Sequence, residues 1–121
     1  MGLERTVHFQ SGIVPDWKSV AAKFGELGIV PVLRMIDGQL AFPDEQPEAS
    51  WSELRIGMPG GMVTLRREGA SVRCLVWGNA DAGLLRNRDQ CCWALAAAGE
   101  GSVTGDDGVL IAAGEFRAAI V

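Results

Sequence analysis

Residues 51–77 read WSELRIGMPGGMVTLRREGASVRCLVW, and this stretch decides the fold. Apolar and polar side chains alternate along it in three runs, which is the pattern of strands with one buried face and one open face. The alternation is interrupted at two glycine-containing segments, Pro59–Gly61 and Glu68–Ser71, where a hairpin could turn. The stretch therefore predicts an antiparallel meander of three strands.

Two helices are predicted, one on each side of this meander along the chain. The first begins after Asp16, a favourable N-cap residue, and ends before Gly28, because apolar residues between them recur at spacings of three and four. The second runs from Asn79 or Asp81 to about Ala98. We expect its core-facing stripe to contain Leu84, Leu85, Arg88 through its stem, Cys91, Cys92 and Leu95.

Shorter strands are predicted before the meander. Residues 6–10 form a first strand, and residues 29–36 and 39–42 form a hairpin. The hairpin turns at Asp37-Gly38, because both residues tolerate a positive φ. Pro31 predicts an edge position for its strand, since proline has no N–H to donate to a ladder.

The C-terminal part of the chain completes the order of elements. Residues 102–104 and 109–112 are expected to pair, whereas residues 116–121 fit either a last strand or a short helix. The order predicts one α+β domain over residues 1–121, with a mostly antiparallel sheet and two helices packed on one face. The strand order within that sheet does not follow from the sequence.

Composition narrows the classes of function. The chain has 11 basic and 15 acidic residues and a net charge of −4, so it lacks the broad positive field that concentrates nucleic acid or anionic membranes. No apolar run is long enough to span a bilayer. The odd number of cysteines and the charged residues Glu4 and Arg5 near the start favour a reducing cytoplasm over secretion.

The residues that could carry chemistry do not form a recognisable set. His8 is the single histidine and is interpreted as a polar residue on a strand face. Cys91 and Cys92 lie in the second half of their helix, where the helix dipole disfavours a thiolate, so we expect them to pack in the core. The sequence therefore predicts no catalytic residue, metal site or cofactor. It favours a binding protein over an enzyme.

A binding role is our leading hypothesis, because apolar surface remains outside the predicted core. Leu75 and Trp77 point to the opposite face of the sheet from Cys74, and Trp93 lies off the apolar face of its helix. We expect Leu75, Trp77 and Trp93 to form an interface, most simply in a homodimer or with another protein partner. Arg66 and Arg73 are expected to pair with Glu53 or Glu68 across strands rather than to hold an anion.

The alternative is a small-molecule-binding protein with a cleft between the sheet and the helices, and weak catalysis at that cleft. Such clefts are mostly apolar and carry a few polar groups. His8, Arg73 and Cys74 are the polar candidates for this site.

Overall fold

The computed structural model describes residues 3–120. Its helices are α1 (Trp17–Glu26), α2 (Ala82–Gly99) and α3 (Ala113–Ile120). Its strands are β1 (Glu4–His8), β2 (Val32–Ile36), β3 (Gln39–Leu40), β4 (Glu53–Met58), β5 (Gly61–Glu68), β6 (Ser71–Leu75), β7 (Ser102–Thr104) and β8 (Leu110–Ala112).

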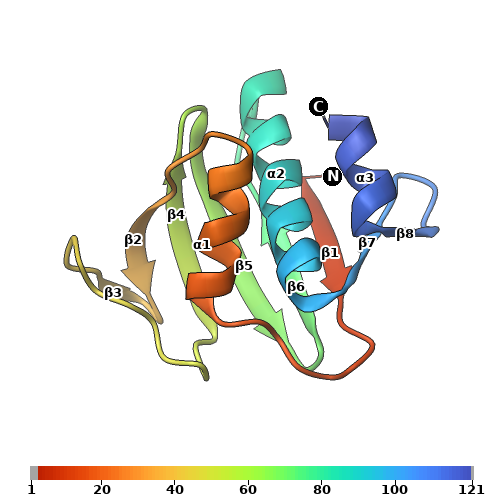
Figure 1. Cartoon of the computed structure of the whole chain (residues 1–121). Helices are drawn as coiled ribbons and strands as arrows, with labels where there is room; N and C mark the ends of the chain where they lie inside the picture. The colour runs from red at the N-terminus through yellow and green to blue at the C-terminus, as the bar shows by residue number, and fades with distance from the viewer. Residues whose placement is uncertain (1–2, 121) are drawn as a thin grey trace.

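All eight strands belong to one antiparallel sheet, and the helices lie on one of its faces (Figure 1). The strands run across the sheet in the order β3-β2-β4-β5-β6-β1-β7-β8. The predicted α+β class is therefore confirmed, with α3 as a third helix beyond the two expected. Within residues 3–120 no helix has the length and apolar character needed to cross a bilayer.

The predicted three-strand meander forms β4, β5 and β6. Leu54 of β4 lies opposite Leu65 of β5, which lies opposite Cys74 of β6, so these three side chains face the helices together. The turn between β4 and β5 packs against α2, where the Gly60 N–H donates to Asn87 Oδ1 at 2.7 Å. A Cβ at residue 60 would lie 2.6 Å from that oxygen, so the close approach requires glycine.

Both predicted helix starts are confirmed by their caps. The Asp16 carboxylate accepts the Ser19 N–H at 2.8 Å, and the Asp81 carboxylate accepts the Leu84 N–H at 2.9 Å. Asp81, and not Asn79, is thus the N-cap of α2. Helix α2 lies between α1 and α3 above the sheet, which is why every residue from Cys91 to Ala96 is buried (Figure 1).

The hairpin around Asp37-Gly38 is also confirmed, with φ values of 50° and 84° at the two turn residues. Strand β2 begins later than predicted, because the Ile29 N–H donates to the Phe24 carbonyl and so belongs to the end of α1. Pro31 lies just before β2. This strand pairs with β3 on one side and β4 on the other, so the prediction of an edge position for it is wrong, and β3 is the edge strand.

Local structure at the two ends differs in detail from the prediction. Strand β1 begins and ends two residues earlier than residues 6–10 and pairs with β6 on one side and β7 on the other. Residues 113–120 form helix α3, so of the two predictions for residues 116–121 the helix is the correct one. Val121 lies outside the described residues.

Candidate functional site

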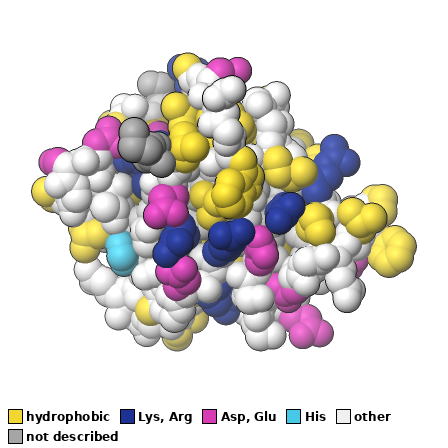
Figure 2. All heavy atoms as spheres, turned by 180° about the vertical axis from the view of Figure 1, so that it is seen from behind, with side chains coloured by type: hydrophobic (Ala, Val, Ile, Leu, Met, Phe, Trp, Pro, Cys, Tyr) yellow, Lys and Arg dark blue, Asp and Glu magenta, His cyan; other side chains and the backbone are white. Residues whose placement is uncertain are grey.

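The face of the sheet opposite the helices is not covered by any described element. Figure 2 shows this face, with apolar side chains gathered near its centre and charged side chains of both signs beside them. Strand register fixes which residues share it, because cross-strand neighbours point to the same side. Thr64 is the central residue of the face, with Arg55 on one side and Leu75 on the other.

An apolar band crosses this open face from β6 to β3. Trp77 follows the alternation of β6 beyond its last residue and is 56% exposed, whereas Leu75 beneath it is buried. The Arg66 guanidinium lies over the Trp77 ring at 5.4 Å from its centroid, a cation–π contact that holds the indole on the face. The residues of the apolar band are Val32, Met35, Leu40, Met62, Leu75 and Trp77.

A charged row runs beside the apolar band and consists of Arg55, Arg66, Arg73, Glu4, Glu53 and Glu68. Arg73 contacts Glu68 at 2.8 Å and Glu4 at 3.6 Å. Arg66 contacts Glu53 at 3.4 Å, so the expected cross-strand pairing of the arginines is confirmed. These ion pairs keep the row close to neutral.

His8 lies at the margin of the open face with both ring nitrogens engaged by hydroxyl groups. Its Nδ1 is 3.1 Å from Ser71 Oγ, and its Nε2 is 3.0 Å from Thr104 Oγ1. The three groups form a hydrogen-bonded chain across β6, β1 and β7, in which the tautomer of the ring sets which nitrogen donates. The two contacts hold the ring between Ser71 and Thr104.

The structure does not bring the three predicted ligand residues together. His8 and Arg73 lie on the open face, whereas Cys74 points to the helices and is completely buried. Burial raises the pKa of the Cys74 and Cys91 thiols well above their ordinary value, which disfavours the nucleophilic thiolate. Within residues 3–120 no group of three His, Cys, Asp or Glu side chains is placed to hold a metal ion.

Only two of the three predicted interface residues lie on the open face. Leu75 and Trp77 do, but Trp93 is 3% exposed and lies on the helix side. The Arg117 guanidinium of α3 covers the Trp93 ring at 4.8 Å from its centroid. The expectation of an exposed Trp93 is wrong because α3 packs against α2, and the sequence did not establish that α3 is a helix.

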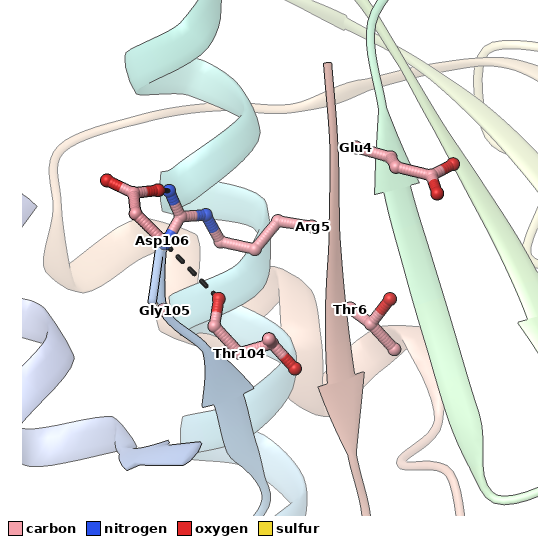
Figure 3. A pocket seen from close by; sticks show the side chains of 6 residues that line it. All are labelled: Glu4, Arg5, Thr6, Thr104, Gly105 and Asp106. Carbon is pink, nitrogen blue, oxygen red and sulfur yellow. Dashed lines mark hydrogen bonds and ion pairs between the residues drawn. The ribbon is translucent and has the colours of Figure 1, made fainter. Parts of the chain in front are cut away.

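A polar hollow that the sequence did not predict separates β1 from the end of β7 (Figure 3). These strands pair only at Val7 and His8, and beyond that point they diverge. The Arg5 side chain extends across the gap toward Asp106, and its Nη1 donates to the Thr104 carbonyl at 3.2 Å. A signal was present in the sequence, since Arg5 alternates with the two apolar residues Val7 and Phe9 and is thereby placed among the core-facing positions.

Comparisons with protein-family models, with curated proteins and with solved structures find no match to this chain. A helix-covered antiparallel sheet serves many unrelated functions. The features that bear on function are therefore the side chains of the open face and of the Arg5 hollow.

Proposed function

We propose that the chain is a non-enzymatic binding domain that self-associates through its open face. The observation that carries this proposal is Trp77, which is 56% exposed, stacked by Arg66 and continuous with the apolar band. Tryptophan and arginine are the residues most enriched among those that dominate binding energy at protein interfaces. Burying the exposed part of this indole on a partner removes apolar surface from water.

The charges of the open face favour a second copy as the partner. The whole chain has a net charge of −4, so two copies repel weakly at long range. The charged row, however, contains three arginines and three glutamates that already contact one another. A face with both signs side by side is complementary to itself, as an isologous dimer requires.

The sheet edges are poor alternatives for self-association. The edge strands β3 and β8 have two and three residues, so each offers few free backbone groups to a partner strand. The apolar band instead reaches from β3 to β6, and five strands at about 4.8 Å spacing span roughly 20 Å. Packing of face against face is thus preferred to the addition of a strand.

The state of the cysteines supports the compartment that we propose. Cys74, Cys91 and Cys92 are all free and buried, which fits the reducing cytoplasm that we propose as the compartment.

Small-molecule binding, the alternative function, is supported at a different place from the one expected, namely the hollow beside Arg5.

Sedimentation tests the self-association directly. We expect the molar mass of the protein to rise from monomer to dimer as its concentration is raised. Trp77→Ala should move this transition to at least about tenfold higher concentration, the usual effect of losing a central aromatic residue. A strict monomer at every concentration would refute self-association.

The matched control is Ile13→Ala, which removes a comparable exposed apolar side chain at a site 70% exposed, away from the sheet face. Ile13→Ala should leave the transition unchanged. An equal shift in both variants would mean that association is driven by general surface hydrophobicity rather than by the open face.

A further inference from the structure

Two neighbouring hollows meet at Arg5 and Asp106. The first has a volume of about 390 Å³ and lies between β1 and the end of β7. The second has a volume of about 440 Å³ and extends from the same two residues to the helices, where Asp89, Phe116 and Ile120 line it. These volumes are in the range of small-molecule sites.

Arg5 is a largely buried cation with three different acceptors. Its Nε lies 3.1 Å from the Asp89 carboxylate of α2, its Nη1 donates to the Thr104 carbonyl, and its Nη2 lies 2.5 Å from Asp106. The Arg5 side chain is only 12% exposed, so each N–H that lost its acceptor would be costly to bury. Nη2 therefore needs an acceptor at the position that Asp106 occupies.

Asp106 supplies this acceptor, but its own side chain is held only weakly by its surroundings. Its side chain is 93% exposed and stands on the turn between β7 and β8. An ion pair with so exposed a carboxylate contributes little stability, because water solvates the acid equally well when the pair is broken. The Asp106 carboxylate can thus be exchanged for another carboxylate at small free-energy cost.

The wall beside the guanidinium is apolar. The Phe116 ring of α3 has its centroid 5.5 Å from the Arg5 guanidinium carbon. Ile111, Ala119 and Ile120 extend the same wall of the second hollow. A cation at the end of an apolar surface recognises a ligand with an anionic head and an apolar body.

We propose that the hollow beside Arg5 binds a small organic acid, with its carboxylate in the place of Asp106 and its apolar body against Phe116 and Ile111. In the free protein Asp106 is an internal stand-in for the ligand carboxylate. The acid Asp89 does not oppose this binding, because its Oδ1 also lies 2.9 Å from Arg88 Nη2. Phe116 and Ile111 of this site lie away from the open face, whereas Glu4 of the charged row also lines the first hollow.

Because Asp106 occupies the position proposed for the ligand carboxylate, removing its charge should change the affinity of the site. Asp106→Asn removes the competing negative charge and keeps the size of the side chain. The binding of 2-naphthoate should therefore tighten by up to about fivefold in this variant, the factor that corresponds to an exposed ion pair. The measurement is titration calorimetry on the full chain, with the neutral 2-naphthamide as a second ligand.

Asp44→Asn is the control for net charge, because it removes one negative charge from the exposed loop before β4 and Asp44 lines neither hollow. It should leave the affinity for 2-naphthoate unchanged, and Asp106→Asn should not improve binding of the amide. Equal tightening in both variants, or equal tightening for acid and amide, would overturn the proposal. So would the absence of naphthoate binding to every variant.

Arg5→Gln provides the opposite arm of the experiment and should abolish the preference for acid over amide. Its melting temperature is measured alongside, since removal of a buried cation leaves Asp89 with one partner fewer. If Arg5→Gln fails to fold, the titrations of Asp106→Asn with 2-naphthoate and 2-naphthamide test the proposal on their own.

Discussion

At the scale of single residues, Asp37 joins the β2–β3 turn to the start of β4. One carboxylate oxygen accepts the Ser52 N–H, the Ser52 hydroxyl and the Glu53 N–H at 2.8–2.9 Å. The backbone hydrogen bond from Glu53, followed by that from Ser52, lowers the pKa of Asp37 below its ordinary value. These bonds favour the charged form of the acid and tie stability to pH.

We predict that Asp37→Asn lowers the free energy of unfolding at neutral pH by roughly 1 kcal/mol or less, because solvent screens this exposed group. Since the folded pKa is depressed, the stabilisation is fully present above the unfolded pKa of about 3.9 and is lost as pH falls through the folded pKa. The difference between wild type and variant should therefore vanish at low pH. Urea unfolding across the acidic range measures it.

The matched control for Asp37 is Asp44→Asn in the exposed loop before β4, where the same change should have little effect on stability at any pH. Asparagine also accepts the positive φ of 50° at residue 37, so the backbone is not strained by the substitution. A pH-independent difference between wild type and Asp37→Asn would contradict the role of the charge.

At the scale of elements, the β4–β5 hairpin and α2 interlock at Gly60. A Cβ at this residue would also lie 2.9 Å from the Leu84 nitrogen, so an alanine would push the hairpin away from the helix. We predict that Gly60→Ala destabilises the fold by about 1–3 kcal/mol, the range of other overpacking changes. Thermal unfolding of the variant provides the measurement.

Gly25→Ala in α1 is the control, because its Cβ would meet nothing within 4 Å. Alanine should there raise stability by up to about 1 kcal/mol, since it restricts the unfolded chain and favours helix. Opposite signs for the two substitutions are expected. Two changes of the same sign would mean that the hairpin and α2 are not held as closely as Gly60 indicates.

The elements with strong local signals were predictable. The alternation of residues 51–77 predicted the meander, and Asp16 predicted the start of α1, whereas Asp81 was one of two candidate caps for α2. Helix α3 is only eight residues long, too short for its periodicity to be distinctive. The position of Trp93 depended on α3, so that side chain was assigned to the surface in error.

The candidate sites also differ in whether local sequence could predict them. Leu75 and Trp77 were assigned to one sheet face from alternation alone, because that property is local. The Arg5 hollow depends on β1 lying beside β7 and below α2, and this strand order is set by contacts distant in sequence. His8, Arg73 and Cys74 were grouped without knowledge of that order, and they are divided between two faces.

At the scale of the whole molecule, tryptophan fluorescence reports on the open face. Trp77 is largely exposed, whereas Trp17, Trp51 and Trp93 are buried. We predict that acrylamide quenches one accessible component of the emission in dilute solution, and that this quenching falls as the protein concentration rises. Trp77→Phe should remove the accessible component, and quenching independent of concentration in the wild type would contradict burial of this face.

The interior place of β1, between β6 and β7, also governs how the chain can fold. Glu4 lies opposite Leu75 and Val7 lies opposite Val103, so both neighbours of the first strand come from much later in the chain. During synthesis β1 is made before both of its partners and stays unpaired until β6 follows, while the β4–β6 meander closes locally. The final step joins a preformed meander to a waiting N-terminal strand. Loop-closure entropy makes such a step slow, so folding should be rate-limited by the arrival of β1 beside β6.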